Sequence, residues 1–139
     1  MRETLLLDTG PLVAFLTSGS QHSAWVHDQW KRTVPPMLTC EPVLTEAAFI
    51  LKRAGGDPDA IFELLDREVI HVSLQVTDEQ TDLRALMRRY RDRPMSLADA
   101  CMVRLSERHG RAKVFTLDSD FRFYRRHGNR TIPVLMPES

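Results

Sequence analysis

The sequence has few cysteines, no net charge and no long apolar segment, and each absence excludes a class of protein. Its two cysteines, Cys40 and Cys101, lie far apart, so they form neither a disulfide framework nor a zinc-binding pattern. Both fall in apolar surroundings, which predicts reduced core residues of a cytoplasmic protein. The chain opens with no basic-then-apolar leader, and no apolar run approaches the length of a membrane span. We therefore expect a soluble protein with no membrane partner.

The chain length of 139 residues is typical of one domain, and we expect residues 1–139 to form a single folding unit. A chain of this size buries roughly two thirds of the surface that its unfolded form exposes. It therefore needs neither a disulfide nor a structural metal to hold a core.

The balanced total charge hides an uneven distribution along the chain. Residues 1–70 carry 6 Lys and Arg against 10 Asp and Glu, a net charge of −4, whereas residues 71–139 carry 13 against 9, a net charge of +4. Nearly all basic residues of the second part are arginines, whose planar guanidinium groups can bind phosphate through two hydrogen bonds. These arginines either contact a phosphate-bearing partner or lie on solvated helix faces, because arginine clusters alone do not establish a nucleic-acid partner.

Short apolar runs alternate with helical patterns along the chain, which predicts an α/β fold. Strands are expected at 5–7, 37–40, 69–74, 113–117 and 132–135, and helices at 11–15, 21–32, 42–54, 57–67, 77–90, 96–109 and 119–126. Thr77-x-x-Gln80 predicts a capping box at the start of the helix over 77–90. The alternation is typical of a parallel sheet covered by helices on both faces. In such sheets the functional crevice lies beyond the carboxyl ends of the strands.

Four acidic residues stand where an ordinary globular domain has little use for a carboxylate: Asp8, Glu46, Asp99 and Asp118. Asp8 and Asp118 directly follow apolar runs, so both are expected at the carboxyl ends of strands. Glu46 interrupts a mostly apolar helix, and Asp99 lies in the first turn of another. One of Asp118 and Asp120 is expected to cap the short helix that follows, and the other to be free for chemistry. Asp118, which is nearer the strand, is the first choice for the site, and Asp120 is the second candidate.

Each of these carboxylates also has a purely structural explanation. Asp8 fits the N-cap of the helix that opens near Pro11. Glu46 fits a solvated charge near Arg53. Asp99 fits the capping box Ser96-x-x-Asp99, in which its side chain reaches back to the cap. For any one of these residues alone, the sequence leaves the structural and the functional explanation open.

If the fold brings the four groups together, only a few kinds of chemistry are compatible with them. Two unit charges about 4 Å apart repel by roughly 4 kcal/mol at the effective dielectric of a protein surface. Crowded carboxylates therefore take up protons or bind a cation. Hard oxygen ligands favour Mg²⁺ or Mn²⁺ over soft metals, and Mg²⁺ keeps most of its waters. The activity that follows is metal-assisted hydrolysis of a phosphodiester.

Three segments of the chain resemble the motifs of one family. Residues 5–15 (LLLDTGPLVAF) resemble the opening of a PIN domain, residues 90–102 (YRDRPMSLADACM) its third acidic motif, and residues 116–121 (TLDSDF) its fourth. The resemblance covers nearly the whole chain and is closest to the VapC-type toxins of toxin–antitoxin pairs. It implies a three-layer α/β/α sandwich with a central, mostly parallel sheet, and an endoribonuclease that depends on Mg²⁺ or Mn²⁺.

Carried over by position, the resemblance assigns roles to particular residues. The catalytic and metal-binding acids would be Asp8, Glu46, Asp99 and Asp118, with Asp120 as a further metal ligand. Thr9 and Thr116 would orient them. The resemblance also implies an RNA substrate, a cognate antitoxin and a homodimer. The arginine-rich second half of the chain would suit either an RNA backbone or an acidic antitoxin segment.

Other functions fit the motifs less well. Asp8-Thr9-Gly10 is also the signature of aspartic proteases, but these need two such aspartates on a nearly all-β fold. A phosphoacceptor receiver domain needs an adjacent acidic pair near Asp8 and a lysine after a later strand, and neither is evident. Within the PIN family, the alternatives are an RNA-processing nuclease without an antitoxin and a catalytically silent domain that binds RNA or a partner.

Overall fold

The computed structural model describes residues 4–138, so residues 1–3 and 139 of the expected domain lie outside it. The strands are β1 (Leu5–Leu7), β2 (Met37–Thr39), β3 (Ile70–Val72), β4 (Lys113–Phe115), β5 (Arg125–Arg126), β6 (Arg130–Thr131) and β7 (Val134–Leu135). The α-helices are α1 (Thr9–Leu16), α2 (Ser23–Lys31), α3 (Glu41–Arg53), α4 (Asp59–Asp66), α5 (Gln80–Arg89) and α6 (Leu97–Arg108). Two 3₁₀ turns complete the set, η1 (Val76–Glu79) and η2 (Ser119–Arg122).

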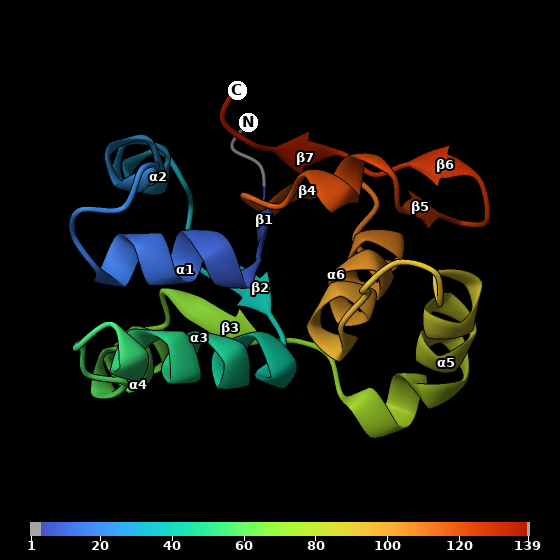
Figure 1. Cartoon of the computed structure of the whole chain (residues 1–139), viewed down its shortest axis with the longest axis horizontal. Helices are drawn as coiled ribbons and strands as arrows, with labels where there is room; N and C mark the ends of the chain where they lie inside the picture. Colours follow the sequence, from blue (N-terminus) through green and yellow to red (C-terminus); the bar gives the residue numbers. More distant parts are fainter. Residues whose placement is uncertain (1–3, 139) are drawn as a thin grey trace.

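The centre of the molecule is a five-stranded sheet with the strand order β3-β2-β1-β4-β7. Every neighbouring pair in this sheet is parallel. In Figure 1, α1 and α2 lie on the left of the strands, and α5 and α6 lie on the right. The predicted α/β/α architecture with a mostly parallel central sheet is therefore confirmed.

The order of the strands creates a switch point between β1 and β4. The chain runs outward from β1 through β2 to β3, then returns to place β4 on the other side of β1. Because parallel connections are right-handed, this reversal carries α5 and α6 to the face opposite α1 and α2. The connections therefore diverge beyond the carboxyl ends of β1 and β4, where α/β proteins form their binding crevices. Asp8 follows β1, and Asp118 lies shortly after β4.

The two strands at the switch point form the middle of the core. Leu6, Leu7, Val114 and Phe115 have no exposed surface. Strands that are covered on both faces need such continuous apolar runs, which is why β1 and β4 were readable from the sequence. Helix α6 packs directly on both strands. The core thus fixes the backbone from which Asp8 and Asp118 project.

Two local predictions are wrong. Thr77-x-x-Gln80 forms no capping box; residues 76–79 make the 3₁₀ turn η1, and α5 begins at Gln80 with no side-chain cap. The expected helix over 119–126 stops at Arg122, and Arg125–Arg126 instead pair with β6 in an antiparallel hairpin. In that hairpin His127 and Gly128 both have positive φ, 50° and 86°, which reverses the chain.

A buried carboxylate explains why the turn before α5 departs from the local pattern. The Glu79 side chain is only 5% exposed and ion-pairs with Arg104 of α6 at 2.7 Å. It also pairs with Arg108 of the same helix. The hydrogen bond from Arg104 is the main reason that the pKa of Glu79 lies below its usual value. The conformation of this turn is therefore determined by the ion pairs of Glu79 with α6 and not by a local capping interaction.

We expect Glu79→Gln to lower the free energy of unfolding by about 3 kcal/mol, because it leaves two arginines without their buried partner. The folded pKa of Glu79 is lowered, so its stabilisation is present above the unfolded pKa of about 4.3 and is lost as the pH falls through the folded pKa. Denaturant unfolding at neutral and acidic pH measures the effect, with exposed Glu63→Gln as the control. A loss of equal size at both pH values would contradict this explanation.

Candidate active site

Asp8 is a buried carboxyl at the end of β1, with only 5% of its surface exposed. Its Oδ2 accepts a 2.6 Å hydrogen bond from the hydroxyl of Thr116. Burial raises the pKa of Asp8 to about 7, against the opposing hydrogen bonds from Thr116 and Thr9 and with added repulsion from Asp99 and Asp118. Asp8 occupies the N-cap position of α1, yet its side chain makes no capping hydrogen bond. The purely structural explanation of this residue is therefore not supported.

A chain of hydrogen bonds links Asp8 to the residues after β4. The Thr116 hydroxyl, which donates to Asp8, accepts the backbone N–H of Asp118 at 3.0 Å. Asp118 Oδ1 then accepts the backbone N–H of Asp120 at 2.9 Å and caps η2. The residue chosen first for the site is therefore also the cap, which corrects the expectation that one aspartate would cap and the other serve the site. The fully buried Thr116 thus couples the ends of β1 and β4.

Asp120 lies at the edge of this group and has a basic partner. Its carboxylate is 3.6 Å from Arg93, whose guanidinium lies over the Phe123 ring at 4.0 Å. Both side chains of the ion pair are partly exposed. Because Arg93 already offsets its charge, Asp120 is a weaker candidate metal ligand than Asp118.

Asp99 is held by the start of α6. Its Oδ2 accepts the backbone N–H of Ser96 at 3.0 Å, and its own N–H donates to the Ser96 hydroxyl at 3.0 Å, so the predicted capping box is confirmed. The buried Tyr124 adds a 3.4 Å hydrogen bond from its hydroxyl to the same oxygen. Burial raises the pKa of Asp99, and repulsion from Asp118 adds to the rise.

Tyr124 was not found from the sequence. It lies in a stretch that was expected to be helical, and no local pattern signals a contact with a residue on α6. Burial raises the pKa of its phenol, so the hydroxyl stays a proton donor to Asp99.

Glu46 is half-buried on α3 and faces the same group. Burial raises its pKa, and the second cause is repulsion from Asp99. Arg53, the neighbour that the sequence suggested, instead stacks over Phe49 at 5.6 Å. The interpretation of Glu46 as a solvated charge near Arg53 is thus not supported.

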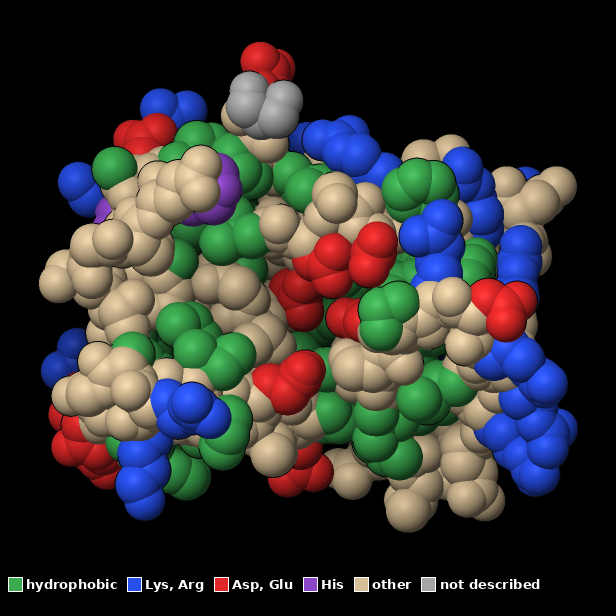
Figure 2. Space-filling view, in the orientation of Figure 1, with side chains coloured by type: hydrophobic (Ala, Val, Ile, Leu, Met, Phe, Trp, Pro, Cys, Tyr) green, Lys and Arg blue, Asp and Glu red, His purple; other side chains and the backbone are tan. Residues whose placement is uncertain are grey.

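The four predicted carboxylates lie near enough to one another for their charges to interact. We call this group the acidic cluster: Asp8, Glu46, Asp99 and Asp118. Repulsion from Asp99 and Asp118 raises the pKa of Asp8, and repulsion from Asp118 raises the pKa of Asp99. Repulsion from Asp99 likewise raises the pKa of Glu46. In Figure 2, acidic side chains gather near the centre of the face shown, between apolar surface and a basic right-hand edge. The fold therefore brings together residues from the first and last parts of the chain.

The residues of the acidic cluster fit a hydrated divalent cation. Within residues 4–138, no three His, Cys, Asp or Glu side chains lie close enough together to ligate one ion directly. Mg²⁺ does not require this, because it is usually bound through one or two carboxylates and keeps several waters. The buried Thr9 hydroxyl beside Asp8 has no hydrogen-bond partner in the described part of the chain. A buried polar atom without a partner is costly, and a metal-bound water would supply one.

Comparison with known proteins identifies the family. Residues 5–126 match the PIN domain family, so the chain belongs to it, as its motifs predicted. The solved structures that share its fold include VapC20 of Mycobacterium tuberculosis, described as a Sarcin-Ricin loop cleaving toxin, with a TM-score of 0.72. That similarity covers 84% of this chain and 92% of VapC20 at 22% sequence identity. A search of curated proteins gave no match.

A membrane-spanning segment needs a long apolar helix, and residues 4–138 contain no helix that meets this requirement.

Proposed function

We propose that the chain is a metal-dependent endoribonuclease in which Asp8, Glu46, Asp99 and Asp118 hold Mg²⁺ or Mn²⁺. The observation that carries this proposal is the buried Asp8, whose carboxyl has a pKa of about 7 beside two further aspartates. Burying carboxylates together is unfavourable unless they are protonated or bind a cation. Perturbed groups of this kind cluster at functional sites. Membership of the PIN domain family and the fold shared with a cleaving toxin support the same reaction.

The chain's own residues would orient the reacting groups. Thr116 holds the Asp8 carboxyl, while Ser96 and Tyr124 hold Asp99. A divalent cation, when bound, polarises the phosphodiester and activates a water. Asp118 is only partly buried and would be accessible to a phosphate, whereas Asp8 is buried beneath the surface of the acidic cluster.

We also propose that the nuclease is the toxin of a toxin–antitoxin pair, acts in the cytoplasm, and forms a homodimer. The fold shared with VapC20 supports the toxin assignment. Phe49 and Phe62 are 63% and 66% exposed, and aromatic residues are enriched at the interfaces between proteins. Light scattering of the purified chain, alone and with its antitoxin, tests the assembly separately from the activity.

RNA cleavage by the purified protein tests the enzymatic proposal. We expect cleavage of an RNA pool with millimolar Mg²⁺ or Mn²⁺ and none with chelator, because the carboxylates alone supply neither a Lewis acid nor an activated water. Restoring activity to the chelated sample with excess metal is the matched control. Cleavage that persists in chelator would rule out the metal-dependent mechanism, and absence of cleavage by folded, metal-loaded protein would favour the catalytically silent alternative.

A further inference from the structure

A groove runs from the acidic cluster along α5. It consists of two adjoining hollows of about 560 and 460 Å³. Glu46 and Ser96 line the first, α5 lines the second, and Val76 and Leu97 line both. One end of the groove therefore lies at the acidic cluster, since Glu46 belongs to it and Ser96 caps the helix that carries Asp99.

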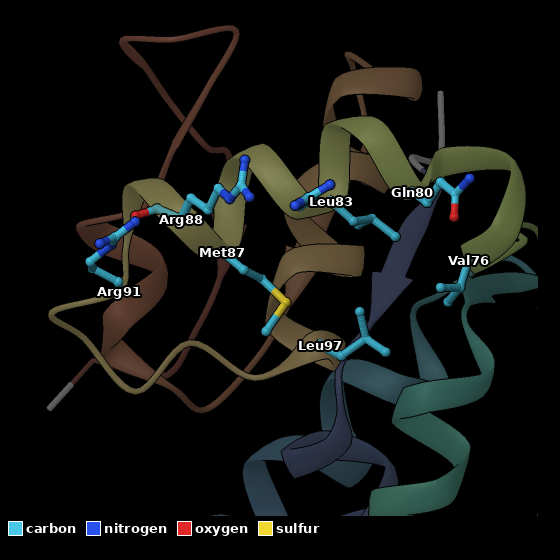
Figure 3. A pocket seen from close by; sticks show the side chains of 8 residues that line it. Val76, Gln80, Leu83, Met87, Arg88, Arg91 and Leu97 are labelled. Carbon is cyan, nitrogen blue, oxygen red and sulfur yellow. The ribbon is translucent and has the colours of Figure 1, made fainter.

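The floor of the second hollow is apolar. In Figure 3, Leu83 and Met87 of α5 face Leu97 at the start of α6, and Val76 closes the end of the gap. Leu97 is 38% exposed although it is a large apolar residue. This floor suits an uncharged partner surface, such as the face of a nucleobase, because contact with it removes apolar side chains from water.

Arginines line the outer margin of the same hollow. Arg84, Arg88 and Arg91 all line it, and all three are exposed. None of the ion pairs formed within residues 4–138 involves them. On α6, by contrast, Arg104 forms ion pairs with Glu79, Asp82 and Glu107, and Arg108 forms one with Glu79. The margin of the groove therefore carries positive charge that is available to a phosphate backbone.

We propose that this groove binds an unpaired stretch of the RNA substrate, with phosphates on Arg84, Arg88 and Arg91 and bases on the apolar floor. This inference rests on the proposed nuclease function, because the strand must lead to the acidic cluster. An A-form duplex keeps its base faces stacked inside, so only an unpaired strand can lay them on the accessible side chains of Met87 and Leu97. Selectivity for unpaired RNA is then a property of α5 and not of the carboxylates.

Salt-dependent RNA binding tests the arginine margin. The binding is measured by fluorescence anisotropy in an Asp8→Asn background, which removes cleavage, with an unstructured oligoribonucleotide. We expect Arg84→Gln with Arg88→Gln to reduce the slope of log affinity against log salt by roughly 1.4, because each lost phosphate contact removes about 0.7. The matched control is Arg67→Gln with Arg111→Gln, two exposed arginines outside the groove, which should leave the slope unchanged. An unchanged slope in the α5 variant, or an equal change in the control, overturns the proposal.

A second variant tests the floor without changing charge. Met87→Gln should weaken binding of the unpaired oligonucleotide severalfold and leave a fully paired RNA of the same sequence unaffected, since only the unpaired strand can bury a base face against this apolar side chain. Equal effects on both RNAs would overturn the assignment of bases to this floor. If the groove instead takes an acidic peptide of a partner protein, the α5 variants will lose that partner while RNA binding persists, which also overturns it.

The two proposals can fail independently. A reduced salt slope in the α5 variant, together with no cleavage by the wild-type protein, would support the proposed RNA-binding groove and contradict the proposed nuclease function. Metal-dependent cleavage with an unchanged salt slope would keep the nuclease and refute the groove.

Discussion

Asp8→Asn is expected to abolish metal-dependent RNA cleavage and, in the same molecule, to stabilise the metal-free fold. The amide loses the charge that would bind a cation, and we expect kcat/KM to fall by about a thousandfold or more, as for other central catalytic groups. The amide oxygen can still accept the hydroxyl of Thr116, so the hydrogen bond between the two strand ends is kept. Burial no longer opposes a charge at this position. Retained cleavage in this variant would contradict the assignment of the active site.

The stability effect of Asp8→Asn depends on pH. Burial raises the pKa of Asp8 from 3.8 to about 7, so the folded state binds this proton more tightly than the unfolded state does. The contribution of Asp8 to the stability of the wild-type protein therefore falls as the pH rises from about 4 to about 7, by a total on the order of 4 kcal/mol. The variant lacks this loss. Denaturant unfolding in chelator should show the two proteins converging at acidic pH and the variant more stable above pH 7; a variant that is less stable at every pH would contradict the assigned cause.

Metal should reduce the same stability difference. A cation that binds only the folded protein stabilises it by about 2.7 kcal/mol at a concentration of 100 times its Kd. We expect Mg²⁺ or Mn²⁺ to raise the melting temperature of the wild-type protein and to have little effect on Asp8→Asn. An equal shift in both proteins would place the cation elsewhere.

Asp99→Asn is expected to remove cleavage by a similar factor while leaving the start of α6 intact. The amide oxygen can still accept the backbone N–H of Ser96, so the cap is kept and only the charge is lost. The informative comparison is Ser96→Ala, which removes the hydroxyl that accepts the Asp99 N–H and should cost about 1 kcal/mol of stability. Its effect on cleavage should be far smaller, because the backbone N–H of residue 96 still holds the carboxylate.

Steady-state cleavage and denaturant unfolding of both variants separate the two roles of Asp99. We expect Asp99→Asn to be inactive but stable, and Ser96→Ala to be active but less stable. The opposite pattern would show that Asp99 serves the helix alone.

The strand ends were predictable because two local signals coincide there. An apolar run that ends in a carboxylate predicts a buried strand, and parallel strands present their carboxyl ends at one edge, so Asp8 and Asp118 could be placed together from the sequence. The position of Asp99 followed from its capping pattern. Family membership and the sheet were predictable for the same reason, since both depend on these motifs.

The remaining contacts depend on residues distant in sequence, which local patterns do not record. Glu46 could be placed at the rim of its helix, but the sequence could not show that it faces Asp99 rather than Arg53. Tyr124 reaches Asp99 only because a 3₁₀ turn and a hairpin replace the expected helix. Glu79 overrides a plausible capping box through its pairing with α6. In each case the deciding partner lies on another element.

The hydrogen bonds that hold the aspartates also limit how each can bind a cation. Protein groups occupy Oδ2 of Asp8, Oδ2 of Asp99 and Oδ1 of Asp118. The second oxygen of each is the one that can turn toward a ligand, so each of the three aspartates would hold a cation through one oxygen, directly or through water. Mg²⁺ is usually bound through one or two carboxylates and keeps several waters. The capping and bridging bonds would therefore limit how many carboxylate oxygens reach the cation, and so leave room for the substrate.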